Sequence, residues 1–235
     1  MTVPEIMSQL EAMGSESIKK ILVKHGIKEP FFGVKIANLK PIQKKIKKDY
    51  ELAKGLYATG NADAMYLAGL IADDDAMTTD DLNIWVKQAT SNNISEYTVP
   101  WVAAEGHHGW ELANNWINDT REHVAAAGWS TLSNFVALKP DSDLDIPALK
   151  SLIKRVEETI HSSPNRVRYT MNGFLISAGG YVAALTGDAI AAAQRIGEIE
   201  IEMNGTACKI PVVKEYIQKI ADKGGIGKKK KTVKC

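Results

Sequence analysis

Apolar positions recur every three or four residues along most of the chain, which is the period of an amphipathic helix. We predict helices at 4–13, 15–25, 36–50, 52–58, 62–72, 79–89, 93–106, 110–117, 121–138, 146–160, 165–185, 188–197 and 212–221. Helices of this length cannot bury their apolar faces alone, but they can when they are stacked in pairs. The pattern therefore predicts an all-α array of helix pairs.

The period changes near the C-terminus. Residues 199–203 and 206–210 alternate between apolar and polar side chains on either side of Asn204-Gly205, a dipeptide typical of tight hairpin turns. We therefore predict a small β-hairpin at about 199–210. The Gly- and Lys-rich segment 223–235 is expected to be a flexible basic tail, which leaves 1–222 as a single helical domain.

Composition narrows the class of protein without identifying a function. The 235 residues are 45% hydrophobic and 24% charged, as is ordinary for a globular protein. The sequence contains no run of about 18 apolar residues and no signal-peptide pattern, so we expect a cytoplasmic protein without a membrane partner. Two cysteines, Cys208 and Cys235, cannot build a disulfide framework or a structural zinc site. Cys208 is most simply interpreted as a small buried thiol.

Charge is balanced overall but unevenly distributed. Lys and Arg number 29 against 28 Asp and Glu, yet many lysines gather within 35–48 and 228–234. Such runs are consistent either with a solvated helix face or with contacts to a phosphate backbone. The candidate backbone contacts are Lys35, Lys44, Lys45, Lys47, Lys48, Lys228, Lys229, Lys230 and Lys231.

The segment 91–101 places one carboxylate, Glu96, among apolar and aromatic residues. If a helix begins at Asn93, Glu96 lies in its first turn and either caps the helix or faces a cleft as an electrostatic or general-base group. Five tryptophans lie between residues 85 and 129. Most should fill gaps between helices, but one or two, such as Trp101, can line a groove that contacts nucleobases or sugars.

Other chemistry has weaker support. His107 and His108, with Glu105 and His123 nearby in sequence, suggest a metal-dependent enzyme, but adjacent histidines on a turn point in different directions. We expect no metal and no cofactor. The sequence also lacks a nucleophile elbow and a Cys–His arrangement with supporting spacing, so it offers no candidate for covalent hydrolysis.

Four short motifs carry a family resemblance. They are Phe31-Phe32-Gly33-Val34 before a basic helix, Val99-Pro100, Asn115-Trp116-Ile117-Asn118, and the helix at 164–181. Over about residues 20 to 195, the chain resembles the bacterial DNA alkylation repair family, whose best-known members are the AlkD-type DNA glycosylases. The resemblance implies a superhelix, or solenoid, of HEAT/ARM-like antiparallel helix pairs with a positively charged groove for duplex DNA. Family members excise N3- and N7-alkylated purines.

The family's site carries over only in part. Its essential aspartate, four residues before the proline of the Val-Pro step, corresponds to Glu96, which keeps a carboxylate for stabilising an oxocarbenium-like sugar. The tryptophan four residues before that acid is Asn92 here, and the groove arginine falls at Ala126. A second groove tryptophan corresponds to Phe174. Arg166 and Arg168, on the same helix as Phe174, are candidates to replace the missing cation.

Two functional hypotheses remain. The first is a monomeric DNA glycosylase-like protein that recognises or excises alkylated purines in double-stranded DNA. Glu96 would be its catalytic residue, and the groove contacts would be Asn92, Trp101, Phe174, Arg166 and Arg168. The alternative, favoured by the absent tryptophan and arginine, is a non-catalytic HEAT-repeat scaffold that binds DNA or a protein partner.

Overall fold

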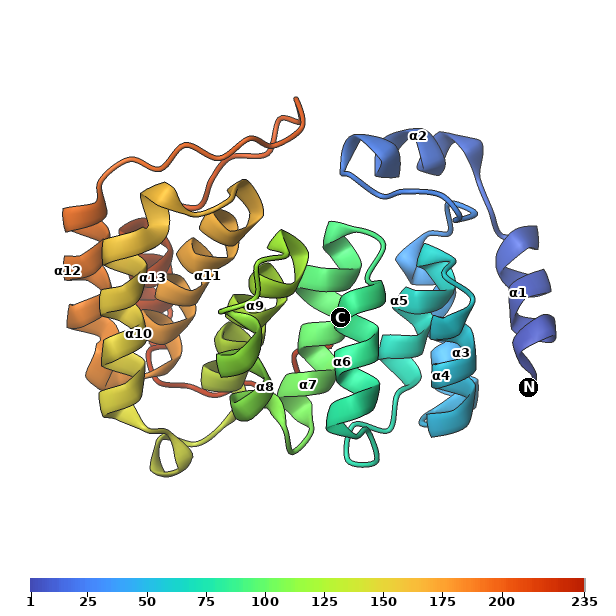
Figure 1. Cartoon of the computed structure of the whole chain (residues 1–235), viewed down its shortest axis with the longest axis horizontal. Helices are drawn as coiled ribbons and strands as arrows, with labels where there is room; N and C mark the ends of the chain where they lie inside the picture. The colour runs from blue at the N-terminus through green and yellow to red at the C-terminus, as the bar shows by residue number, and fades with distance from the viewer. Residues whose placement is uncertain (235) are drawn as a thin grey trace.

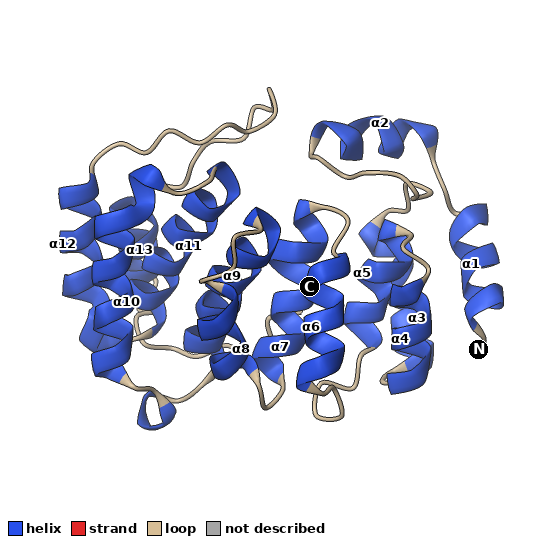
Figure 2. Ribbon diagram, viewed as in Figure 1, coloured by secondary structure: helices blue, strands red, loops and turns tan. Residues whose placement is uncertain are grey.

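The computed structural model describes residues 1–234, which form thirteen α-helices, one π-helix and three 3-10 helices without any strand (Figures 1 and 2). The elements are α1 (Val3–Ala12), α2 (Glu16–Lys24), α3 (Ile36–Ile46), α4 (Tyr50–Ala58), α5 (Ala62–Ile71), α6 (Thr79–Gln88), η1 (Ile94–Thr98), α7 (Val99–Glu105), α8 (Gly109–Trp116), α9 (Glu122–Leu138), η2 (Asp141–Asp143), α10 (Ile146–Thr159), η3 (Ile160–Ser162), α11 (Asn165–Tyr181), η4 (Ala183–Leu185), α12 (Thr186–Ile196) and α13 (Val213–Asp222). The predicted all-α array is confirmed.

The helices are stacked side by side along the long axis of the molecule, with the N-terminus at one end (Figure 1). All ten residues of α5 are buried, and α9 and α11 are buried over much of their length. A helix that is apolar on all sides needs neighbours on all sides. These helices therefore form the interior of the stack, while α10, with a polar outer face, covers it.

Local signals fix several helix starts as the sequence predicts. Thr78 and Asp81 form a reciprocal capping box at α6, and the Asn61 side chain accepts hydrogen bonds from the main chain of Asp63 and Ala64 at the start of α5. The carboxylate of Asp63 then accepts the main-chain N–H groups of 32–34, at 2.6, 3.0 and 3.2 Å. The first turn of α5 thereby holds the turn that precedes α3.

The predicted hairpin is wrong, although its turn is present. Asn204 and Gly205 have φ values of 51° and 66°, and the Thr206 N–H donates to Met203 O at 3.0 Å. The flanking residues do not pair with each other (Figure 2). Instead, Asn165 of α11 makes hydrogen bonds of 2.7 and 3.0 Å with the main chain of Glu202. Because helix side chains occupy these backbone groups, residues 197–212 form an irregular excursion, which we call the roof loop.

The expected flexible tail is also not what the structure shows. Residues 223–234 cross the C-terminal ends of α5, α7, α9 and α11 and make hydrogen bonds there. Gly227 N–H donates to Gly180 O and Lys230 N–H to Ala137 O, at 3.0 and 2.8 Å. The Nζ atoms of Lys229 and Lys234 donate to Val136 O and Ala72 O. Helix C-termini present unpaired carbonyls and a partial negative charge, so a basic segment suits this position.

The described chain has no helix with both the length and the apolar character required to cross a membrane.

Candidate functional site

A cavity of about 640 Å³ lies where η1 meets the first turns of α7 and α11. The end of α2, the start of α3, the roof loop and α13 complete its walls. The lining residues are Leu22, His25, Ile27, Ile36, Tyr66, Asn92, Asn93, Glu96, Tyr97, Trp101, Arg166, Tyr169, Met203, Asn204, Thr206, Cys208, Lys209, Pro211 and Tyr216. Segments far apart in the sequence therefore share one site.

The roof loop passes over this cavity. From α12 it runs above α10 and α11 towards the end of α2 (Figure 1). A Cβ atom added at Gly26 would lie 3.3 Å from the side-chain nitrogen of Asn204 and 3.5 Å from that of Asn92. The loop tip, the end of α2 and the segment before η1 thus converge at one point, and the cavity is bridged from one half of the stack to the other.

The π-helical turn that carries Glu96 has a cause in the sequence. Pro100 has no N–H to donate to Glu96 O, and its ring would clash with that carbonyl in a regular α-helix. The backbone widens instead, and the Val99 N–H donates to Ile94 O, five residues back. Gly69 of α5 allows the turn to pack closely, because a Cβ atom there would overlap Thr98 Cγ2. The turn directs Glu96 towards α11.

Glu96 forms a two-pronged ion pair with Arg166. Arg166 Nε donates to Oε1 at 2.7 Å and Nη2 to Oε2 at 2.5 Å, and Glu96 is only 4% exposed. Burial raises the pKa of the Glu96 carboxyl, and the Arg166 guanidinium offsets part of that rise. Arg166 also lies over the Tyr169 ring, 4.4 Å from its centroid. Glu96 is therefore bound to another helix and does not cap its own.

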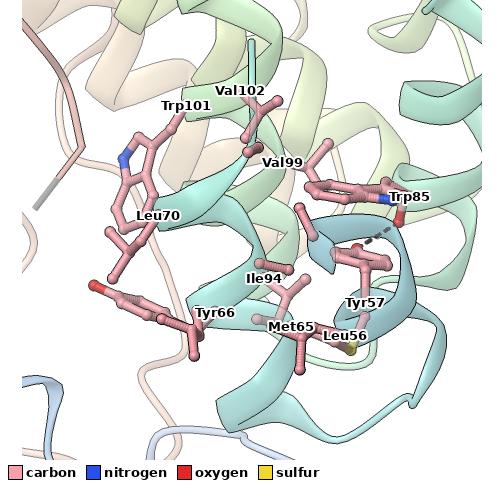
Figure 3. Close-up of a cluster of buried hydrophobic side chains, with 14 of the residues drawn as sticks. Leu56, Tyr57, Met65, Tyr66, Leu70, Trp85, Ile94, Val99, Trp101 and Val102 are labelled. Carbon is pink, nitrogen blue, oxygen red and sulfur yellow. Dashed lines mark hydrogen bonds between the residues drawn. The ribbon is translucent and has the colours of Figure 1, made fainter. Parts of the chain in front are cut away.

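Five aromatic side chains line the cavity: Tyr66, Tyr97, Trp101, Tyr169 and Tyr216. Trp101 and Tyr66 meet edge to face with ring centroids 5.3 Å apart, and the Tyr66 hydroxyl points away from the apolar cluster (Figure 3). Tyr97 and Tyr216 are 45% and 43% exposed. Sequence patterns did not identify Tyr66 or Tyr216, since each lies on a separate helix. Tyr169, three residues after Arg166, carried a weak local signal.

The proposed groove residues separate into two groups. Asn92, Trp101 and Arg166 line the cavity together with Glu96, whereas Arg168 donates to Glu200 O at 2.7 Å and holds the base of the roof loop. Phe174 requires a correction, because it is fully buried against Trp129 and cannot act as a groove wall. Ala126 is also fully buried, so its position in this chain does not face the cavity.

The candidate lysines likewise differ in their surroundings. Lys35, Lys44, Lys45 and Lys47 are exposed on or beside α3. The Nζ atom of Lys48 instead lies 3.4, 3.8 and 3.8 Å from the carboxylates of Asp73, Asp74 and Asp75.

The tail lysines lie on the opposite edge of the stack from the cavity. Lys229 pairs with Asp141 at 2.8 Å, and Lys230 lies over the Tyr181 ring, while Lys228 and Lys231 are exposed beside them. The tail contacts Gly180 near the end of α11, and the cavity uses Arg166 near its start. Fourteen helical residues separate these positions by about 21 Å. This placement does not favour a role for the tail lysines at the cavity.

The lining of the cavity offers one lysine to an anion. Glu96, already paired with Arg166, is its single acidic lining residue among the described residues, whereas Lys209 and His25 also line it. Lys24, Lys28 and Lys35 are exposed and adjoin lining residues in sequence, as do the exposed acids Glu202 and Glu215. Lys209 is therefore the residue of the lining best suited to meet an anion.

The structure does not assemble the metal site considered at His107 and His108. Within residues 1–234, no group of three or more His, Cys, Asp and Glu side chains is arranged to hold a metal ion. His107 Nε2 lies 3.5 Å from Asp75 Oδ1 on an exposed turn. Cys208 is exposed on the roof loop, which corrects its interpretation as a buried thiol.

Asn165→Ala is expected to loosen the roof loop without unfolding the protein. The substitution removes both side-chain bonds to the main chain of Glu202, each worth about 1 kcal/mol. Hydrogen exchange should become at least about fivefold faster at residues 200–206, with α11 unchanged. Asn114→Ala, which removes a half-buried asparagine whose side chain bonds to Trp110 O within α8, is the matched control. Unchanged loop exchange would show that other contacts hold the roof.

Comparison with known proteins gives a consistent result. Residues 6–209 match the family model described as DNA alkylation repair enzyme. An uncharacterised protein of Listeria innocua is 30% identical over 224 residues, and one of Listeria monocytogenes is 29% identical; each alignment covers 93% of this chain and 96% of the relative. A solved structure, from a new family of proteins related to the HEAT-like repeat DNA glycosylases with affinity for branched DNA structures, has a TM-score of 0.92. It is 36% identical, with complete coverage of both chains.

Proposed function

Since the chain belongs to the DNA alkylation repair enzyme family, we propose that it binds DNA with a preference for branched structures and does not hydrolyse glycosidic bonds. Its HEAT-like fold and the branched-DNA affinity described for its structural relative support the binding half of this proposal. The ion pair between Glu96 and Arg166 supports the other half.

The state of Glu96 is the observation that carries the proposal. A carboxylate that stabilises a sugar cation or positions water needs an oxygen directed at the substrate. Both oxygens of Glu96 accept charge-assisted hydrogen bonds from one guanidinium, and the side chain is 2% exposed. Releasing it would separate a desolvated pair, which costs several kcal/mol. Glu96 therefore serves the architecture of the site.

The roof loop favours branched over straight DNA. It spans from α11 to the end of α2, above the cavity. A continuous duplex laid through the cavity would have to pass through the loop. The arms of a junction, in contrast, diverge from the branch point and can lie on either side of the loop, where exposed lysines on α2 and α3 are available to phosphates.

We expect the purified protein to bind a three- or four-way junction more tightly than a linear duplex of the same length, with affinity falling steeply as salt is raised. It should release no base from duplexes that contain N7-methylguanine or N3-methyladenine. Lys209→Ala should reduce the slope of log K against log salt by about 1, as the loss of one phosphate contact does. Fluorescence anisotropy titrations and a base-release assay measure these quantities.

Lys154→Ala is the control for charge, because Lys154 is an exposed lysine of α10 outside the cavity. It should leave the salt slope unchanged. Base release that disappears in Glu96→Gln would contradict the proposal and restore the glycosylase hypothesis. Equal affinity for junctions and linear duplexes would remove the preference for branched DNA.

A further inference from the structure

The roofed cavity has the dimensions of a nucleotide site. Its volume of about 640 Å³ falls within the range of about 300–1,000 Å³ that is usual for small-ligand pockets. A cube of this volume has an edge of about 9 Å, whereas the major groove of B-DNA alone is about 12 Å wide. Part of one strand therefore fits the cavity, and a double helix does not.

The lining has the chemistry of a stacking site for bases. Every base has a π-face, and proteins that hold single strands place aromatic rings against it. The rings of Tyr97 and Tyr216 are nearly half exposed, from η1 and from α13, although apolar groups of this size are usually covered. Ile36, 47% exposed, also lines the cavity, so three of the large exposed apolar side chains gather at this site.

Polar groups are placed to recognise a base edge and its phosphate. Asn92 and Asn93 line the cavity, and an amide can offer both a donor and an acceptor to a base. The Ser91 hydroxyl already donates to Asn93 Oδ1 at 2.5 Å, so Asn92 is the better candidate for reading a base edge. The interior is close to neutral, because Glu96 and Arg166 compensate each other. Lys209 lies on the roof loop. This distribution suits a neutral base inside the cavity with its phosphate at the rim.

Building on the proposed function, we propose that this cavity binds one unpaired nucleobase at the branch point of DNA, stacked on Tyr97 and Tyr216 beneath the roof loop. The occupied cavity then distinguishes a branch with an unpaired nucleotide from a fully paired one. The ion pair between Glu96 and Arg166 forms the floor of the cavity. Arg166 also stacks on Tyr169 and so holds this third lining ring in place. Asn92 contributes an edge-reading amide to the lining.

A test uses 2-aminopurine, a base whose fluorescence falls when it is stacked. One three-way junction carries it as a single unpaired nucleotide at the branch point, and a matched junction carries it paired within an arm. We expect protein binding to quench the unpaired probe alone. We also expect at least about fivefold tighter binding to the junction with the unpaired nucleotide than to a fully paired junction, as one base stack contributes.

Tyr97→Ala and Tyr216→Ala should remove both the quenching and the affinity difference, and leave binding at the level of the fully paired junction. Tyr97→Phe should retain both, since stacking requires only the ring. Ile84→Ala removes an apolar side chain that is 51% exposed outside the cavity and should change neither quantity.

The possible failures are distinguishable. If junctions bind but the unpaired probe is not quenched, or if the two tyrosine variants behave as wild type, the cavity does not hold a base and the proposed function stands alone. If no DNA binds even at low salt, both proposals are overturned.

Discussion

Arg166→Ala is expected to destabilise the fold by about 3 kcal/mol, since removal of one partner leaves a charge buried without compensation. The remaining partner, Glu96, is almost fully buried beneath the cavity, and no other cation contacts its carboxylate among the described residues. Denaturant-induced unfolding, followed by circular dichroism at neutral pH, measures the loss. A change below about 1 kcal/mol would mean that water reaches the carboxylate and replaces the guanidinium.

The destabilisation should shrink as the pH falls. Burial raises the pKa of Glu96 in the folded state, and Arg166 opposes that rise, so the pKa in the variant should be higher still. In the pH window between the unfolded and folded pKa values, the folded state binds the proton more tightly. Stability then decreases as pH increases through this window. The deficit of Arg166→Ala should therefore be largest at neutral pH and smallest near the ordinary carboxyl pKa.

Two matched variants separate the ion pair from the loss of side-chain volume. Glu96→Gln combined with Arg166→Ala removes the buried charge, so it should recover part of the stability and lose most of the pH dependence. Arg195→Ala breaks the exposed pair with Glu157, formed at 2.6 Å, and should leave the unfolding midpoint nearly unchanged. A double variant as unstable as the single one would assign the effect to packing.

Truncation after Asp222 is expected to cost at least about 3 kcal/mol, because it leaves Asp74 buried without its main cation. Lys234 Nζ lies 2.6 Å from Asp74 Oδ1, and both side chains are at most 10% exposed. The truncation also removes the hydrogen bonds at the ends of α9 and α11. Thermal and denaturant unfolding measure the effect, and Lys234→Met isolates the contribution of the ion pair.

Lys231→Ala serves as the control for the tail, since Lys231 is exposed in the same segment. It should unfold at the wild-type midpoint. A truncated protein as stable as the full chain would show that the tail contacts add nothing to the fold.

Hydrophobic periodicity predicted most of the fold, since a helix in a stack must show its buried face in its own sequence. The same pattern could not reveal η1. It indicated one helix from Asn93 to Gly106. In the structure, Pro100 widens the backbone over Ile94–Thr98 into a π-helical turn, and the α-helix begins only at Val99. The signal was present in the proline itself, because a proline after the first turn must disturb the carbonyl four residues earlier.

The two errors near the C-terminus share a physical reason. Asn204-Gly205 specifies a turn, but strand pairing also requires free backbone groups on both arms, and Asn165 and Arg168 of α11 occupy those of one arm. Lysine runs suggest mobility or phosphate binding when they are considered alone. The ends of α5 and α9, which are far apart in the sequence, supply hydrogen-bond acceptors for Lys229, Lys230 and Lys234 here.

The site was only partly predictable. Glu96 was singled out by its local surroundings, but its partner Arg166 lies 70 residues away, and no periodicity connects the two. Phe174 was assigned by its position after a glycine, and only the packing of α9 against α11 shows that it belongs to the core. Aromatic residues that meet from five separate elements cannot be grouped without the fold.

A helical solenoid can normally change its curvature, because each repeat contacts only its neighbours and small rotations between repeats add up along its length. Residues 227–234 run across this stack from Gly180 to Ala72 and also bond to the ends of α9 and α7 on the way. These contacts tie together helices of both halves, and hence constrain the curvature of the face they enclose. For the proposed binding of branched DNA, such a preset curvature would lower the ordering cost and discriminate against DNA of the wrong shape.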